Sequence, residues 1–559
     1  GPKSALLALG PSLALSVDNA RCGLKNGIWA LGLAGLYSIV LVVLRTPQLS
    51  HLLEDKSLFK SSLIIHVDLS VLAWMLSITC VIWSIGRRYH FESVLSKLAF
   101  LGMILMATSP LLESSRPVMN NYVPILENIW FIIGLSLFGA VVLCFAILVV
   151  VDVILRKRSD LKNSENYINM ARWPHSFRSL AMTLPIIKLT TALMYIMVWI
   201  CFALSYRDLM TLINVFPIDI DYYYELLFWS GGHLMQFIYT QVVMFVWLIL
   251  AQKWMGKKLH YYEIYAKIFV INFALGGLIF YGHFAYEMSQ YEFTAFFTKH
   301  MQYVGGIAPI LFILVLGVDI FKLRRAEIAR RHCEEPQAPW QSHASGDPHV
   351  ALRAPQDDNL TAQDDAPPAF VRTAFIASTL LFFVGGLIGI LISGINVSIP
   401  AHYHGSIVGI SIAFLGLAYV FCFGVKINVS KEFLSSVLSV SEGSSSKSRD
   451  LYDQSVKPLL LEPELKELDP SICSGSSTGN ALIKLANIQL FLITIGQLLH
   501  ISGLALAGGY GIMRKNPDGV IATSAKVYMG MMGGGGLIAI IGGLMFVYIC
   551  GRRLYNFQN

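Results

Sequence analysis

"IPAHYHGSIVG", residues 399–409, opens a long apolar segment and places His402 and His404 two residues apart at its start. On an α-helix, residues i and i+2 point about 200° apart, so the two imidazoles face different sides. They therefore cannot both ligate one ion, but each can hold a cofactor on its own side of the helix. The pair predicts a helix that separates two neighbouring redox centres.

The composition indicates a membrane protein. Of 559 residues, 55% are hydrophobic and only 14% are charged, which is more apolar surface than a soluble globular protein needs. The net charge of +7 is modest, and in such a chain basic residues mark cytoplasmic loops rather than nucleic-acid binding. The eight cysteines are scattered without a C-x-x-C pair, so we expect no disulfide framework, zinc site or iron–sulfur cluster.

Apolar runs of about 20 residues are long enough to cross the bilayer core. They predict an all-α transmembrane bundle of about 12 helices, at 27–45, 61–85, 97–113, 123–155, 176–204, 225–251, 265–287, 300–321, 370–394, 401–424, 482–510 and 526–550.

The loop charges predict the orientation of these spans. Basic stretches such as "GRRYH", "LRKRSDLK" and "KLRRAEIARR" follow even-numbered spans, whereas the connections after spans 5, 7 and 9 are poor in Lys and Arg. Because cytoplasmic loops carry the excess of positive charge, both termini are expected in the cytoplasm.

The spans divide the chain into an ordered series of segments. Two long polar loops, "EEPQAPWQSHASGDPH…" and the Ser-rich "SEGSSSKSRD…", are typical of flexible cytoplasmic insertions. The predicted organisation is an N-terminal segment (1–26), helices 1–8 (27–321), a polar loop (322–369), helices 9–10 (370–424), a Ser-rich loop (425–481), and helices 11–12 with the C-terminal tail (482–559).

Six of the 14 histidines fall inside the predicted spans. Helix direction alternates, yet at about 1.5 Å per residue all six lie in the outer part of the membrane. A lone histidine is often only a hydrogen-bonding partner for a neighbouring helix, but a common depth favours metal or cofactor ligation. The six are His66, His233, His283, His402, His404 and His500.

The ordered set of spans and histidine-containing motifs resembles the catalytic subunit I of the heme-copper oxidase superfamily, over roughly residues 27–550. The resemblance rests on twelve spans, the histidine of span 2, "GGHLMQF" on span 6, "YGHFAYE" on span 7 and "AHYHGSIVG" on span 10. His233 and His283 lie 50 residues apart, which suits the family, and "GGYGIMRKN" resembles its basic pair near heme propionates.

The resemblance implies a role for each matched residue. His66 and His404 would be the axial ligands of a low-spin heme, and His402 the proximal ligand of a high-spin heme whose other face is open to a gas. A second metal, either copper or non-heme iron, would face it. Its ligands would be His233 and His283, and the heme propionates would pair with Arg514 and Lys515.

Three departures concern the second metal. Where the family has a further histidine directly after the span-7 histidine, this chain has Phe284. Phe237 stands where oxygen reductases commonly carry a tyrosine. Gln236, near the position of the glutamate of nitric oxide reductases, either orients a metal-bound water or bridges helices.

Two ionisable residues are candidates for a proton route. Lys188 lies halfway along span 5 beside two threonines, and it is alternatively a lysine that snorkels or bridges helices. Asp319, at the inner end of span 8, is a candidate proton entry or an interfacial charge.

The resemblance therefore implies a terminal respiratory oxidase that reduces O2 to water with proton uptake, in a bacterial cytoplasmic membrane or an equivalent energy-transducing membrane. Nitric oxide reduction is the alternative enzyme, and a non-catalytic heme-binding relative in gas sensing or assembly is the alternative from another class. Electrons would come from cytochrome c, a quinol or a partner subunit, because the chain has neither a C-x-x-C-H motif nor a cupredoxin motif. Other oxidase subunits are expected partners. The number of spans alone would also fit a transporter whose histidines are structural.

Overall fold

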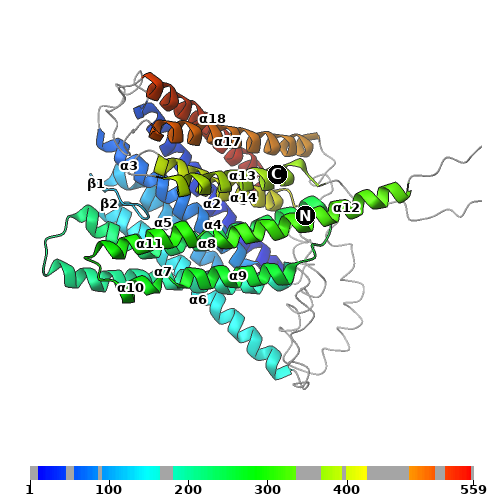
Figure 1. The fold of residues 1–559 in the computed structure, drawn as a ribbon, viewed down its shortest axis with the longest axis horizontal. Coiled ribbons are helices and arrows are strands. Elements are labelled where there is room, and N and C mark those ends of the chain that lie inside the picture. Colours follow the sequence, from blue (N-terminus) through cyan, green and yellow to red (C-terminus); the bar gives the residue numbers. More distant parts are fainter. Residues whose placement is uncertain are drawn as a thin grey trace, which may run out of the picture.

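The structure is a computed structural model, and it describes residues 11–45, 56–85, 91–163, 180–334, 367–392, 398–424, 477–509 and 523–555. Long helices run side by side through these residues (Figure 1). The elements are α2 (Pro11–Arg45), α3 (Lys56–Val67), η2 (Asp68–Ala73), α4 (Trp74–Ser84), α5 (Glu92–Leu112), β1 (Arg116–Val118), β2 (Ile125–Glu127), α6 (Ile129–Asn163), α7 (Leu180–Ile213), α8 (Ile220–Met255), α9 (Tyr262–Gly277), α10 (Phe280–Ala285), α11 (Tyr291–Val304), α12 (Ile307–Glu334), α13 (Ala369–Leu391), α14 (Ser398–Cys422), α17 (Ser477–Gly509) and α18 (Thr523–Tyr555).

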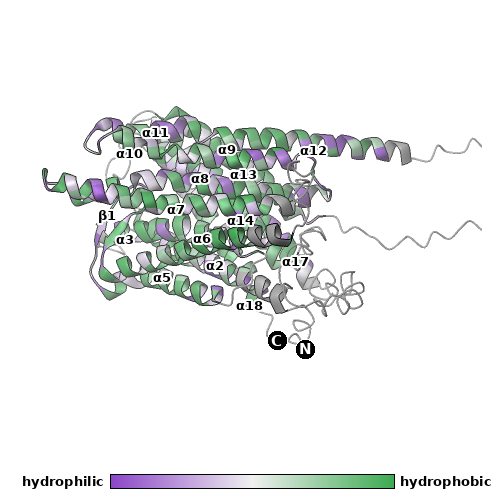
Figure 2. Cartoon of the chain, turned by 90° about the horizontal axis from the view of Figure 1, so that it is seen from below, coloured by the Kyte–Doolittle hydropathy of each residue, from purple (hydrophilic) through white to green (hydrophobic). Residues whose placement is uncertain are grey.

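Twelve helical segments of the described chain are long and apolar enough to cross a membrane, which confirms the predicted all-α bundle. Figure 2 shows hydrophobic residues along most of each helix and hydrophilic ones gathered toward several helix ends, as on the outer part of α12. Such a distribution suits a bundle whose flanks face lipid and whose ends face water.

Several predicted span boundaries differ from the observed ones, and the local structure explains two of the differences. The fourth span begins at Ile129 rather than at 123, because the apolar residues before it form the strand β2. The eighth begins at Tyr291 rather than at 300, since α11 and α12 follow one another across a break at Gly305 and Gly306.

The polar segment predicted over 322–369 is partly helical, because α12 continues to Glu334. Its residues are good helix formers. Glu327 accepts from Arg330 one turn later at 3.3 Å and also pairs with Lys257 of the preceding loop. The rest of this segment, 335–366, and most of the Ser-rich loop, 425–476, lie outside the described residues.

Three spans form the interior of the bundle. The apolar windows of α8, of the second span (Leu58–Ser84) and of α14 are 94%, 78% and 72% buried, whereas those of the other nine are 50% buried or less. Polar side chains on these three helices therefore face protein rather than lipid. They are the helices that carry the predicted histidines of spans 2, 6 and 10.

The second span contains a π-helical segment, η2, which begins two residues after His66. A π segment holds extra backbone in one wide turn, and such segments are rare and frequently lie at functional sites. The Ser70 hydroxyl donates to the His66 carbonyl oxygen at 2.6 Å within this turn. The wide turn thus sets the directions of the side chains that follow His66.

Helices α13 and α14 touch backbone to backbone through glycines. A Cβ atom added to Gly385 would lie 2.2 Å from the Ser406 nitrogen, and one added to Gly405 would lie 2.5 Å from the Gly385 Cα. Small residues permit such close approach between membrane helices. The contact brings the Gly385 carbonyl to the start of α14.

Replacing Gly385 by alanine is expected to destabilise the protein by about 1–3 kcal/mol, because the added methyl group overlaps the α14 backbone. Thermal or chemical unfolding of the purified protein measures this. Gly386→Ala is the matched control, since a Cβ at Gly386 meets nothing within 4 Å. Equal effects of the two substitutions would contradict the close packing.

A two-stranded antiparallel hairpin joins α5 to α6. Its strands pair Arg116 with Glu127 and Val118 with Ile125. The Glu225 carboxylate of α8 accepts from the backbone nitrogen of Asn121 at 2.9 Å, which ties the turn to the first part of α8. The hairpin therefore holds residues 119–124 beside the central helix.

Candidate functional site

A cavity of about 2810 Å³ lies among the second span, α8, α13, α14, α17 and α18. Pockets for one small ligand usually measure roughly 300–1,000 Å³, so this space accommodates more than one bulky group. Aliphatic residues, aromatic residues and glycines form much of its wall. Five of the six predicted intramembrane histidines line it, namely His66, His233, His402, His404 and His500.

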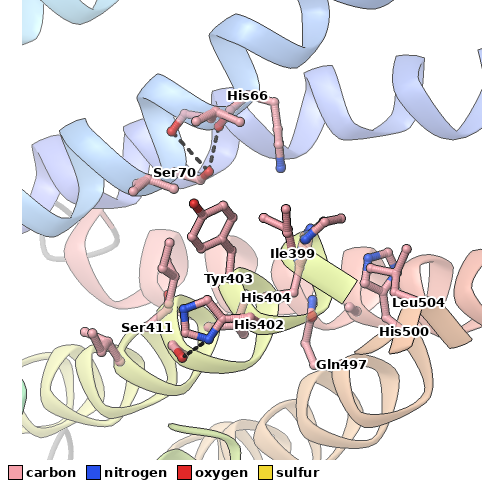
Figure 3. Close-up of a pocket in the computed structure, with 18 of the residues that line it drawn as sticks. His66, Ser70, Ile399, His402, Tyr403, His404, Ser411, Gln497, His500 and Leu504 are labelled. Atoms are coloured by element: carbon pink, nitrogen blue, oxygen red, sulfur yellow. Dashed lines mark hydrogen bonds between the residues drawn. The ribbon is translucent and has the colours of Figure 1, made fainter. Parts of the chain in front are cut away.

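His66 projects from its helix into the cavity toward the start of α14 (Figure 3). Its Nδ1 lies 2.9 Å from the Ala34 carbonyl oxygen. A carbonyl oxygen only accepts, so Nδ1 carries the proton and Nε2 keeps its lone pair. The ring therefore presents a nitrogen that is able to ligate a metal.

His402 is held in the same way on the α13 side of the cavity. Its Nδ1 donates to the Gly385 carbonyl oxygen at 2.7 Å, and a Cβ on Gly389 would lie only 2.5 Å from that nitrogen. The close approach of α13 and α14 thus fixes the ring and again leaves Nε2 with its lone pair.

His404 faces the opposite side of α14, toward α17. Its ring centroid lies 4.5 Å from that of His500, with the rings at 62°. His500 donates from Nδ1 to the Met532 carbonyl oxygen of α18 at 2.9 Å. His402 and His404 therefore contact different helices, as the two-residue spacing predicts (Figure 3).

These rings fit heme ligation. Histidines that ligate metals usually donate their other N–H to a carbonyl or carboxylate, which fixes the ring and its tautomer. His66, His402 and His500 all have such a bond to a backbone carbonyl. The cavity is large and largely apolar, which suits flat apolar macrocycles.

His233 and His283 differ in their position relative to the cavity and in their hydrogen-bond partners. His233 lines the cavity, but its Nε2 lies 2.9 Å from the Tyr122 hydroxyl. His283 lies away from the cavity lining, with its Nε2 2.9 Å from the Ser230 hydroxyl. Within the described ranges, no three His, Cys, Asp or Glu side chains gather as a metal centre would require.

The three residues expected beside the second metal have different surroundings. Gln236 lines the cavity. Phe237 instead stacks on His300 at 5.2 Å, on the side of α8 that faces α11. Phe284 is 80% exposed, because the short helix α10 turns the residue after His283 outward. Phe284 therefore faces away from the protein, whereas Phe237 lies one helical turn after His233 on α8.

Lys188 is buried and bridges helices. Its ammonium donates to the carbonyl oxygen of Ile85, at the end of the second span. Nearby, Gln241 donates to Thr190 at 2.7 Å and accepts from Asn272 at 2.7 Å, so a buried polar chain crosses α7, α8 and α9. Lys188 lies away from the cavity lining.

Asp319 is fully buried and anchors the loop between α8 and α9. Its carboxylate accepts from the backbone nitrogens of His260 and Tyr261 at 2.8 and 3.2 Å, and from the Tyr265 hydroxyl at 3.0 Å. The His260 Nδ1 lies 2.7 Å from its other oxygen. These contacts give it a structural role.

Replacing Asp319 by alanine should destabilise the fold by roughly 2–4 kcal/mol, since several buried donors lose a charged acceptor. Unfolding of the purified protein measures the change. Glu327→Ala, which removes a surface ion pair with Lys257, should cost no more than about 1 kcal/mol. Comparable losses would show that Asp319 is not an anchor.

Several charged residues line the cavity wall. Lys60 and Lys526 line it, whereas the predicted Arg514 and Lys515 lie outside the described residues. Asp68 also lines it, 1% exposed, and its carboxylate oxygens have no hydrogen-bond partner among the described residues. An unpaired acidic group at this depth is costly and marks a functional region.

Comparisons with known proteins yield two relatives and a shared fold. No protein-family model matches the chain. An uncharacterized protein of Rickettsia prowazekii is 37% identical over 96% of both chains, and an uncharacterized protein of Aquifex aeolicus is 22% identical over 70% of this chain and 82% of its own length. A heme-copper terminal oxidase dimer solved by cryo-EM superposes with a TM-score of 0.54 and 13% identity, covering 97% of this chain and 83% of that chain.

Proposed function

The chain belongs to the family of the Rickettsia prowazekii protein, and from this premise, with an oxidase-like fold, we propose that it is a heme-binding oxidoreductase of the terminal-oxidase type. The observation that carries the proposal is the convergence of five histidines on one apolar cavity in the interior of the bundle. A transporter with structural histidines gives no reason for that convergence.

The proposed heme ligands are assigned by the side of the cavity that each imidazole ring faces. His66 and His404 would hold one heme, from the second span and from the α17 side of α14. His402, on the α13 side, would hold the other. Bound heme supplies one-electron transfer where both axial positions are filled and gas binding where one is free.

The protein's own groups position and insulate these hemes. The carbonyls of Ala34 and Gly385 fix the rings of His66 and His402, and the short separation of positions 402 and 404 keeps the two sites adjacent. Lys60 and Lys526 offer positive charge to carboxylates at the cavity wall. The polar chain of Thr190, Gln241 and Asn272, with Lys188 beyond it, remains our candidate for proton delivery.

The proposed substrate is O2, with NO as the alternative within the same class. The donor would be a soluble cytochrome, a quinol or a partner subunit, and the location an energy-transducing membrane such as the bacterial cytoplasmic membrane. A non-catalytic gas-binding role is the second candidate. The Tyr122–His233 contact favours it, because it occupies a histidine that the metal site of an oxidase would use.

Gas consumption by the purified full chain tests the proposal. With a chemical reductant and a redox mediator, we expect uptake of O2, and uptake of NO under anaerobic conditions if NO is the substrate. Boiled protein and free hemin are the controls. If both rates equal those of the controls while the heme spectrum is intact, the enzyme proposal falls and the gas-binding role replaces it.

A further inference from the structure

His233 is engaged at both ring nitrogens. Its Nδ1 lies 2.7 Å from the Trp229 carbonyl oxygen, and its Nε2 lies 2.9 Å from the Tyr122 hydroxyl. Because the carbonyl only accepts, Nδ1 carries the proton, and Nε2 must accept the phenol O–H. The lone pair that a metal would need is therefore already in use.

The ring of Tyr122 has a place built for it on α8. A Cβ atom added to Gly232 would lie 2.1 Å from the ring carbon Cγ of Tyr122, so only glycine leaves room. The ring packs edge-on against Trp229 at 5.6 Å and tilted against His233 at 4.7 Å. The glycine before His233 thus seats the phenol over the imidazole.

The loop that carries Tyr122 is braced at several points. The Asn120 side-chain oxygen accepts from the backbone nitrogens of Tyr122 and Val123 at 3.1 and 2.8 Å. Glu225 accepts from the backbone and from the side-chain amide of Asn121. These bonds hold the phenol against His233 rather than leaving it as a chance contact.

No third His, Cys, Asp or Glu side chain joins His233 and His283 in a metal-ligating group among the described residues. Phe297 of α11 packs against both rings, with centroids 6.0 Å from His233 and 5.7 Å from His283. Non-heme copper, zinc and iron sites in proteins usually need at least three protein ligands. The expected second-metal site therefore does not fit the residues present.

We propose that His233 is the hydrogen-bond acceptor of Tyr122 and not a metal ligand, so that the cavity holds no non-heme metal and a tyrosine–histidine pair stands in its place. The inference rests on the proposed function only in treating the cavity as a heme cavity. A gas bound beside His402 would then share the cavity with a phenol and an imidazole instead of a second metal.

Metal analysis of the purified full chain tests this directly. Copper, zinc and iron are measured by mass spectrometry per polypeptide, and heme is measured in the same sample. We expect iron to equal heme, with copper and zinc far below one ion per chain. About one copper, or one iron in excess of heme, per chain would overturn the inference, and its loss in His233→Ala but not in His300→Ala would assign that metal to His233. His300 is the matched control because it is buried and bonded to a carbonyl, but lies off the cavity lining.

A vibrational measurement tests the pair itself. The phenol band assigned to Tyr122, found as the infrared difference between the wild type and Tyr122→Phe, should have the frequency of a hydrogen-bond donor. It should shift in His233→Ala and stay unchanged in His300→Ala. An unshifted band in His233→Ala would show that the pair does not form. Because metal is counted per polypeptide, a protein without heme would refute the proposed function and still report on this inference.

Discussion

Replacing His402 by alanine should abolish carbon monoxide binding to the reduced protein while leaving a low-spin heme spectrum in place. The ring is clamped by the Gly385 carbonyl on the α13 side of α14, and its removal takes away the only proposed protein ligand of that heme. The CO-binding heme should fall from about one per chain to nearly none. The measurement is the CO-minus-reduced difference spectrum, quantified against total heme, together with the rate of gas consumption.

His300→Ala serves as the control for this prediction. His300 is buried and stacked between Phe237 and Phe296, but it does not line the cavity. It should therefore retain the CO difference spectrum. Full CO binding in His402→Ala, or loss of both hemes with the fold intact, would contradict the assignment of His402 and His404 to separate cofactors.

Replacing His66 by alanine should remove the low-spin spectrum and retain CO binding, the reverse of the first result. His66 projects into the cavity from the second span, and it is the proposed partner of His404 across one heme (Figure 3). Without one of its two axial ligands, that heme should become five-coordinate or dissociate. His404→Ala should therefore give the same spectrum. Reduced-minus-oxidised spectra and electron paramagnetic resonance measure the change.

His500 supplies a sharp test of that ligand set. Its ring lies 4.5 Å from the His404 ring, so His500→Ala removes a neighbour without removing the proposed ligand. The low-spin signal should shift modestly and persist. A complete loss in His500→Ala, with persistence in His404→Ala, would make His500 the axial ligand and refute the assignment to His404.

The fold could largely be predicted from the sequence because each span must satisfy its own backbone hydrogen bonds and is visible as an apolar run. The helical periodicity at His402 and His404 likewise predicts opposite faces, and the structure places the two rings against α13 and α17. The predicted start of the fourth span at residue 123 is wrong because an apolar strand and the end of an apolar helix have similar sequences over a few residues.

The second-metal site could not be judged from the sequence, because its state depends on contacts between distant segments. Tyr122 lies 111 residues before His233, in a loop whose only local signal is the Asn120–Asn121 pair that turns the chain. Gly232 belongs to the stretch "GGHLMQF" on which the resemblance rests, and it also makes room for that phenol. Phe284 faces outward because of a break between α9 and α10 that the apolar pattern does not reveal.

The heme content and optical spectrum of the purified full chain test the proposal most directly. We expect two noncovalently bound hemes per polypeptide, one low-spin and one that binds carbon monoxide when reduced, because the cavity offers a two-histidine site at His66 and His404 and a one-histidine site at His402. A colourless protein without a Soret band, purified from cells with ample heme, would contradict the account.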